Sequence, residues 1–226
     1  MNKVKEKLER GETVVMVNPN YPSPGIVEFI GKLGFNVAFI DTEHGPIGME
    51  RIEDMVRAAK VAGISTVLRP AENNRPMIVR YLDRGVDGLM VPHVDTAEAA
   101  ERIVETVRYA RFENPEDTLI IAMIESPEAI ANLDGILAVD GIDMVFIGPS
   151  DLSQTMGFPG QPNHPEVAAA MDGIITRALA AGKPVGAAVD WDNTRPLIEK
   201  GVRYVYIHAN RFLESGGAAF QALVTP

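Results

Sequence analysis

The sequence predicts an α/β fold in the form of a single (β/α)8 barrel, and three observations lead to that prediction. Short β-rich segments recur eight times along the 226 residues. They are almost entirely apolar, as expected of parallel strands that are buried on both faces. Longer, helix-like segments fill the intervals, and no Pro/Ser-rich linker divides the chain. This alternation is typical of a barrel of parallel strands enclosed by helices.

The predicted strands follow one another at fairly regular intervals. They comprise residues 13–18, 36–41, 65–70, 88–93, 119–125, 143–148, 184–190 and 204–209. A doubly wound open sheet is the alternative fold. Such sheets usually have fewer strands, and no Gly-x-Gly-x-x-Gly turn follows the first strand here.

Helices are predicted between the strands and at both ends. The clearest between strands are residues 98–110, 165–182 and 194–201. The first carries apolar residues on one face, the second begins with proline and ends with glycine, and the third also ends at glycine. A charged helix over about residues 1–11 precedes the first strand, and an apolar helix over about residues 210–223 follows the last. We therefore expect residues 1–226 to form one barrel domain.

The composition excludes several classes of partner and site. The formal net charge is -10 at pH 7, so the basic patches that nucleic acid or an anionic membrane requires are not expected. The chain has no cysteine, which excludes disulfides, zinc–thiolate sites and a cysteine nucleophile, and which fits a reducing cytoplasm. The N-terminal segment lacks the apolar core of a signal peptide, and no apolar run is long enough to span a membrane. We expect a cytoplasmic protein that binds neither nucleic acid nor membrane.

Polar residues gather where the predicted strands end, which is the face where barrels of this kind carry their chemistry. They are Asn18, Asp41, Glu43, His44, Arg69, His93, Glu125, Gly148, Pro149, Ser150, Asp151, Asp190 and His208. The opposite ends of the strands carry few such residues. This asymmetry predicts an enzyme.

Two carboxylates follow neighbouring buried strands and predict a metal site. Glu125 follows the apolar run "IIAMI", and Asp151 follows "MVFIGPS". Neighbouring strands lie about 4.8 Å apart, so both side chains could share one divalent ion. Ligation by oxygen alone suits Mg²⁺ or Mn²⁺. In the alternative interpretation Asp151 caps the following helix, while Glu125 pairs with Arg69 or with a backbone amide.

Arg69 and His44 suggest acid–base and charge-stabilising roles. An arginine at the mouth of a barrel binds carboxylates or stabilises a developing oxyanion, although Arg69 could instead form a salt bridge with Glu43 or Glu125. His44 could act as a general base near neutral pH, and Asp83 is one carboxylate that could orient it.

The remaining strand-end residues allow a binding role or a purely structural one. The amides around Ser150 could bind a substrate carboxylate where Gly148 lets the backbone approach closely, or the segment could be a tight turn. His93 and His208 are expected to be structural or supporting residues.

Several segments together resemble the HpcH/HpaI aldolase family, whose members are class II, metal-dependent pyruvate aldolases acting on 4-hydroxy-2-oxo acids and 2-keto-3-deoxy sugar acids. The segments are "FIDTEHGP", "VLRP", "YLDRGVDGLMVPHV", "IESPEAIANLD" and "FIGPSDLSQTMGFPGQPNHPEV", and the resemblance runs from about residue 14 to 210. It implies a barrel of the phosphoenolpyruvate/pyruvate type. It also implies a homo-oligomer, a hexamer built as a trimer of dimers with the last helix exchanged.

The resemblance implies binding roles for five of the strand-end residues. Glu125 and Asp151 would hold the divalent metal, Mg²⁺ or Mn²⁺, with Co²⁺ or Zn²⁺ as alternatives. The metal would chelate the 2-oxo group and the carboxylate of pyruvate. Gly148, Pro149 and Ser150 would bind that carboxylate.

It also implies catalytic roles for a second group. Arg69 would neutralise the enolate oxygen, and His44, oriented by Asp83, would move the proton on the 4-hydroxyl group. Asp41 and Glu43 would position water at the metal. The expected function is therefore reversible cleavage of a 4-hydroxy-2-oxo acid to pyruvate and an aldehyde. The alternatives are a citrate-lyase-like lyase acting on a CoA thioester and a non-catalytic relative that binds oxo acids.

The chain departs from this resemblance at the rim of the expected site. Relatives carry a long segment after the fourth barrel helix, which is missing here after residue 110. Relatives often have a tryptophan near the first strand, where this chain reads "MVNPN". After the last strand they usually read Gly-Val-Asp, where this chain has His208, Ala209 and Asn210. The metal and acid–base residues are kept, so the reaction class is expected to be kept as well.

Overall fold

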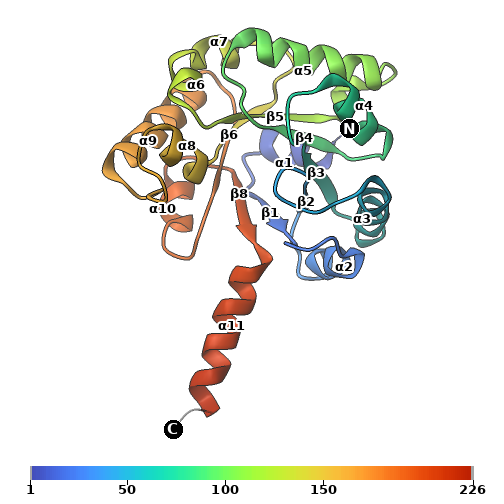
Figure 1. Ribbon diagram of the computed structural model, residues 1–226, viewed down its shortest axis with the longest axis vertical. Helices are drawn as coiled ribbons and strands as arrows, with labels where there is room; N and C mark the ends of the chain where they lie inside the picture. The colour runs from blue at the N-terminus through green and yellow to red at the C-terminus, as the bar shows by residue number, and fades with distance from the viewer. Residues whose placement is uncertain (1, 225–226) are drawn as a thin grey trace.

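The computed structural model describes residues 2–224 and has a closed barrel of eight parallel strands at its centre (Figure 1). The strands are β1 (Val14–Asn18), β2 (Val37–Asp41), β3 (Ser65–Arg69), β4 (Gly88–Val91), β5 (Leu119–Ile124), β6 (Met144–Ile147), β7 (Val185–Ala188) and β8 (Tyr204–His208). Each of the eight predicted strands is confirmed, and each is one to three residues shorter than predicted. Because β8 pairs with β1 from Val14 beside Tyr204 to Asn18 beside His208, the sheet has no edges, and the open-sheet alternative is wrong.

Helices surround the barrel, and each connection between strands contains one or two helical elements that return the chain to the start of the next strand. They are α2 (Pro24–Lys32), α3 (Met49–Ala62), α4 (Arg75–Asp83), α5 (Ala97–Ala110), the 3₁₀ turn η1 (Pro115–Asp117), α6 (Pro127–Ala131), α7 (Leu133–Ala138), α8 (Pro149–Thr155), α9 (Pro165–Ala180) and α10 (Thr194–Glu199). The three helices predicted between strands are confirmed within a few residues. Side-chain caps at Ser23, Asn74, Thr96 and Ser126 explain where four of these helices begin.

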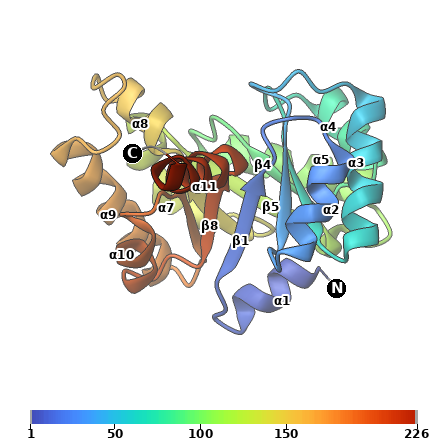
Figure 2. The ribbon, with the colours of Figure 1, turned by 90° about the horizontal axis from the view of Figure 1, so that it is seen from below.

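The apolar residues form an inner and an outer layer. The inner layer fills the barrel with side chains such as Met16, Phe39 and Met123, and α1 (Lys3–Glu9) contributes Val4 and Leu8 to it. The outer layer lies between the strands and the surrounding helices. Figure 2 shows α1 at one end of the barrel and α8 at the other. Chemistry is therefore confined to the end opposite α1, where the strands finish.

The last helix, α11 (Ala209–Val224), points away from the barrel (Figure 1). None of its residues is buried. Its first turn is anchored to the barrel, where the ring of Phe212 stacks on Phe35 and makes an edge-to-face contact with Trp191. The predicted helix over about residues 210–223 is thus present, but it does not cover its own barrel. No helix within residues 2–224 combines the length and apolar character needed to cross a membrane.

Candidate active site

A cavity of about 250 Å³ opens at the C-terminal ends of the strands. Its apolar lining comes from inward-facing side chains of the strands, and its polar lining from strand ends and the loops that follow. The lining residues are Phe39, Asp41, His44, Arg69, Met90, Met123, Phe146, Gly148, Pro149, Ser150, Asp151, Ala188, Tyr206 and His208. Most of the predicted site residues therefore share one cavity.

Arg69 is held rigidly by two carboxylates on the neighbouring strand and loop. The register of β2 and β3 places Asp41 directly beside Arg69. Arg69 donates from Nε and Nη2 to the two oxygens of Asp41, at 3.0 and 2.8 Å, and its Nη1 lies 2.8 Å from Glu43 Oε2. Burial alone would raise the pKa of Asp41, but the hydrogen bonds and charge of Arg69 outweigh it, and that pKa lies below its usual value.

The loop after β2 is folded around the same carboxylate. Asp41 Oδ1 accepts hydrogen bonds from the backbone amides of Glu43 and His44, at 3.1 and 3.4 Å. Such a turn uses a short acidic side chain to satisfy amides that the strand no longer pairs. The motif "DTEHG" is therefore a structural unit that aims Glu43 at Arg69. Of the two salt bridges considered for Arg69 from the sequence, the one with Glu43 is confirmed and the one with Glu125 is wrong.

Glu125 and Asp151 face a common space beside Gly148. A Cβ atom placed on Gly148 would lie 3.2 Å from Glu125 Oε2 and 3.5 Å from Asp151 Oδ2, so only glycine leaves the gap between the carboxylates open. Glu125 is 1% exposed. Burial is the main cause of its raised pKa; contacts with His93 oppose the shift and the negative charge of Asp151 adds to it.

These two carboxylates fit a hard divalent cation. They supply oxygen ligands, and a shared positive charge would offset the penalty of placing the buried carboxylate of Glu125 close to that of Asp151. No cluster of three or more potential metal-binding His, Cys, Asp or Glu side chains occurs within residues 2–224, so water and substrate would complete the coordination. The capping alternative for Asp151 is wrong, because Gly148 is the N-cap residue of α8 and no side chain caps this helix.

His93 contributes more to the site than the sequence suggested. Its backbone has φ 54°, in the left-handed region that side-chain-bearing residues rarely adopt. In this conformation its amide donates to Glu125 Oε1 at 2.8 Å, and its Nδ1 lies 3.2 Å from the same oxygen. Nε2 lies 3.8 Å from Glu43 Oε1. His93 thus leaves Glu125 Oε2 as the oxygen directed towards Asp151, and the backbone-amide pairing considered for Glu125 is present.

His44 and Asp83 are not brought together within the chain. His44 lines the cavity rim, is largely exposed, and has Glu43 as its charged neighbour at 3.9 Å. Asp83 is the exposed last residue of α4. Because α4 leads the chain back towards the start of β4, Asp83 lies near the opposite end of the barrel from His44. The expectation that Asp83 orients His44 is not met by the geometry of one chain.

The turn between β6 and α8 forms one wall of the cavity. Gly148, Pro149 and Ser150 all line it, as expected for a segment that would hold a substrate carboxylate. Proline has no amide hydrogen, so Pro149 contributes shape and only its neighbours can donate from the backbone.

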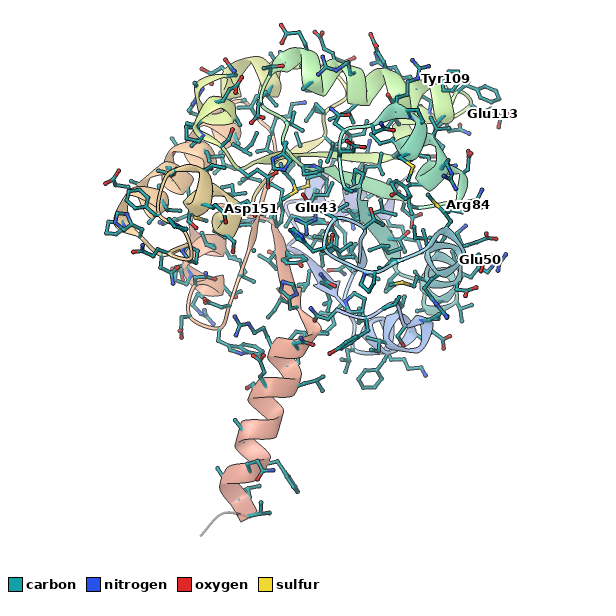
Figure 3. All side chains as sticks on the ribbon, viewed as in Figure 1. Glu43, Glu50, Arg84, Tyr109, Glu113 and Asp151 are labelled. Atoms are coloured by element: carbon teal, nitrogen blue, oxygen red, sulfur yellow. The ribbon has the colours of Figure 1, made fainter. Side chains whose placement is uncertain are left out.

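In Figure 3, drawn from the same viewpoint as Figure 1, Glu43 and Asp151 lie near the middle of the barrel, while Glu50, Arg84, Tyr109 and Glu113 lie at its periphery.

A second polar group in the cavity was not identified from the sequence as a functional unit. Tyr206 and His208 of β8 line the cavity and form hydrogen bonds with Asn18, the last residue of β1, and with Asn20 in the loop after it. Alternate residues of a strand point the same way, so the spacing of Tyr206 and His208 could have indicated a shared inward face. Burial raises the pKa of Tyr206 to about 12, whereas burial followed by the charge of Arg211 lowers the pKa of His208.

Comparison with known proteins gives consistent matches over almost the whole chain. The profile of the HpcH/HpaI aldolase/citrate lyase family matches residues 16–207. The chain is similar to the pyruvate aldolase of Rhizobium etli, with 35% identity over 209 residues, covering 82% of this chain and 82% of that protein. It is also similar to the 2-keto-3-deoxy-L-rhamnonate aldolase of Escherichia coli, with 33% identity over 238 residues, covering 95% and 89%. The crystal structure of an HpcH/HpaI aldolase from Desulfitobacterium hafniense has a TM-score of 0.87 and 28% identity, covering 100% and 98%.

Proposed function

The chain belongs to the HpcH/HpaI aldolase/citrate lyase family, and from that premise we propose that it is a divalent-metal-dependent aldolase. It would cleave a 4-hydroxy-2-oxo acid to pyruvate and an aldehyde, and would catalyse the reverse addition. The main support is that Arg69 and Asp151 line one cavity, while Glu125 lies beside Gly148 in the wall of that cavity. Two neighbouring carboxylates, one of them buried, together with a fixed guanidinium form a charge arrangement that suits the formation of an enolate.

Glu125 and Asp151 would hold the cation, and Mg²⁺ or Mn²⁺ suits their oxygen ligands better than Co²⁺ or Zn²⁺. When bound, the cation would act as a Lewis acid that stabilises negative charge on the 2-oxo oxygen. The cavity of about 250 Å³ that Gly148 and Asp151 line would take the 2-oxo acid. The amides around Ser150 are available for its carboxylate group.

Arg69 would stabilise the same developing charge from the opposite side. A guanidinium has five N–H donors, of which three are directed at Asp41 and Glu43. Within residues 2–224 no acceptor is recorded for the two remaining donors, on Nη1 and Nη2, so they would be available to a substrate oxygen. Because the arginine is already fixed by the two carboxylates, little reorganisation is needed when the charge develops. Asp41 and Glu43 thus serve mainly to hold Arg69, and their expected role in positioning water stays a prediction.

His44 is the candidate base for the 4-hydroxyl proton. It lies at the cavity rim, and imidazole gains and loses a proton near neutral pH. Its charged neighbour within the chain is Glu43 rather than Asp83. We therefore assign the orientation of His44 to the loop after β2, which Asp41 organises.

The exposed C-terminal helix supports a homo-oligomer. Leu213, Phe220 and Leu223 are 71%, 64% and 81% exposed along α11. An apolar helix that leaves its own barrel in this way is stabilised if it packs on a second copy of the chain. The hexameric arrangement and the cytoplasmic location stay predictions.

The proposal is tested by hydrogen exchange of pyruvate, which avoids any assumption about the aldehyde. The protein is stripped with chelator, supplied with Mg²⁺ or Mn²⁺ and pyruvate in D₂O, and the methyl proton signal is followed by NMR after Mn²⁺ has been removed. We expect metal-dependent loss of the signal. Glu125→Gln should abolish it, whereas Glu128→Gln, the same change at an exposed residue of α6, should not. Absence of exchange with both metals would refute the aldolase proposal.

A further inference from the structure

Four polar side chains at the β8–β1 side of the cavity form a continuous hydrogen-bonded chain. Asn18 Nδ2 donates to the phenol oxygen of Tyr206 at 2.8 Å. That oxygen lies 3.1 Å from His208 Nε2, and His208 Nδ1 lies 2.7 Å from Asn20 Nδ2. The direct pairing of Asn18 with His208 in the sheet brings these residues together.

Two backbone amides determine the direction of every bond in this chain. The amide of Asn20 donates to Asn18 Oδ1, and the amide of Asn210 donates to Asn20 Oδ1. An N–H can only donate, so each contacted side-chain atom must be the amide oxygen. The NH₂ groups of Asn18 and Asn20 therefore face Tyr206 and His208, respectively.

The direction of these bonds fixes the tautomer of His208 and the role of Tyr206. Because Asn20 donates to Nδ1, that nitrogen carries no proton, and the proton of the neutral ring is on Nε2. Nε2 then donates to the Tyr206 oxygen, which already accepts from Asn18. The lowered pKa of His208 is consistent with a neutral ring. The Tyr206 oxygen thus accepts two hydrogen bonds, and within residues 2–224 no acceptor is recorded for the hydrogen of its O–H group.

The ring of Tyr206 is also held firmly in place. It packs edge-on against Phe39 and Phe146, with ring centroids 5.2 and 6.1 Å away. Both phenylalanines line the cavity. The O–H group is therefore a fixed donor at the cavity wall rather than a mobile side chain.

The position of this donor indicates which part of a substrate it meets. Glu125 directly follows β5 and Asp151 lies in the first turn of α8, after β6, whereas Tyr206 belongs to β8, which is three strands from β5 and two from β6 in the ring of eight. His208, one step further along the same face of β8, is exposed at the cavity mouth. A 2-oxo acid beside the carboxylates leaves the β8–β1 side to the second reactant, which enters from the mouth.

We propose that Tyr206 is a specificity-determining residue whose O–H group donates a hydrogen bond to an oxygen on the aldehyde half of the substrate, next to the reacting carbonyl. This inference rests on the aldolase activity proposed above. His208, Asn20 and Asn18 are positioning residues that keep the phenol hydrogen directed into the cavity. A site built to donate one hydrogen bond discriminates against an analogue that lacks the acceptor. The enzyme therefore prefers 2-hydroxyaldehydes to aldehydes without that hydroxyl group.

The test compares addition of pyruvate to glycolaldehyde and to acetaldehyde, which differ by this hydroxyl group alone. The measured quantity is the ratio of the two kcat/KM values in the Mg²⁺-loaded, full-length protein. We expect the wild type to favour glycolaldehyde, and Tyr206→Phe, which keeps the ring contacts, to lower the ratio about tenfold. His208→Ala should lower it in the same direction but less. Tyr109→Phe, the same change at an exposed tyrosine of α5, should leave it unchanged.

The outcomes separate this inference from the activity on which it rests. A wild type without a preference for glycolaldehyde, or a Tyr206→Phe variant with the wild-type ratio, would overturn the inference. Equal slowing of both aldehydes by Tyr206→Phe would also overturn it, because a packing role or a contact with pyruvate affects both reactions alike. Absence of metal-dependent pyruvate exchange in the wild type would instead overturn the aldolase proposal, and this inference with it.

Discussion

Replacing Asp41 with asparagine tests the central electrostatic unit of the site. Arg69 is 8% exposed and directs two of its three in-chain bonds at Asp41. In Asp41→Asn, one side-chain oxygen can still accept from Arg69 and the loop amides, but the other is replaced by an NH₂ group that faces an N–H donor. The variant therefore loses one charge-assisted hydrogen bond and the neutralising charge.

The size of the effect follows from the burial and the partners of Arg69. A charge-assisted hydrogen bond contributes about 1.5–3 kcal/mol, and breaking a buried ion pair costs about 3–5 kcal/mol. Glu43 remains as a second anion 2.8 Å from Nη1, so the cost lies at the lower end of the second range. We expect the free energy of unfolding to fall by about 3 kcal/mol. Aldolase turnover should also fall, because Arg69 is no longer fixed.

The same variant should change how stability depends on pH. The pKa of Asp41 is lower in the folded than in the unfolded chain. Its stabilising contribution is thus complete above the unfolded-state pKa of about 3.9 and is lost as the pH falls through the lower folded-state pKa. Asp41→Asn removes this part of the acid dependence.

Urea denaturation followed by circular dichroism, at several pH values and equal protein concentration, measures both effects. Asp140→Asn is the matched control, because Asp140 pairs with Arg108 at 3.1 Å but its side chain is 99% exposed. Exposed pairs contribute about 0–1 kcal/mol, so this control should be nearly neutral. A loss below about 1 kcal/mol in Asp41→Asn, together with an unchanged acid dependence, would refute the reasoning.

Three further predictions concern the metal and the last helix. Gly148→Ala should weaken Mn²⁺ binding at least about tenfold by calorimetry, because the added Cβ fills the space between the carboxylates of Glu125 and Asp151. Gly173→Ala is the control and should bind Mn²⁺ normally, because a Cβ there meets nothing within 4 Å. Equal affinities of the two variants would contradict the assigned metal position. Metal at a hundredfold excess over its dissociation constant should stabilise the wild type by about 2.7 kcal/mol in thermal unfolding, and Glu125→Gln should show little of this gain. Phe220→Asp combined with Leu223→Asp should reduce the mass measured by light scattering, because two charges then replace the exposed apolar face of α11; an unchanged mass would exclude that face from the subunit contact.

The strand pattern and the positions of strand ends are readable from the sequence because both depend on local order. A run such as "IIAMI" must be buried on both faces wherever it lies, and a carboxylate that follows it must lie at the rim. Glu125 and Asp151 follow consecutive strands, and consecutive strands are neighbours in this barrel. Their approach therefore required no knowledge beyond strand order. The pairing of Arg69 with the loop after β2 follows from the same adjacency, although the sequence did not identify Asp41 as its main partner.

Only the tertiary structure decided which distant residues share a hydrogen bond. Asp83 was expected to orient His44, but it lies towards the other end of the barrel, because α4 reverses the chain direction. Asn18 and Tyr206 are 188 residues apart, and closure of the barrel between β8 and β1 places them within 2.8 Å. The left-handed backbone of His93 is likewise invisible in the sequence. Hydrogen bonds require partners within a few tenths of an ångström, and residue order determines neighbouring strands but not the register, closure and backbone twist that set such distances.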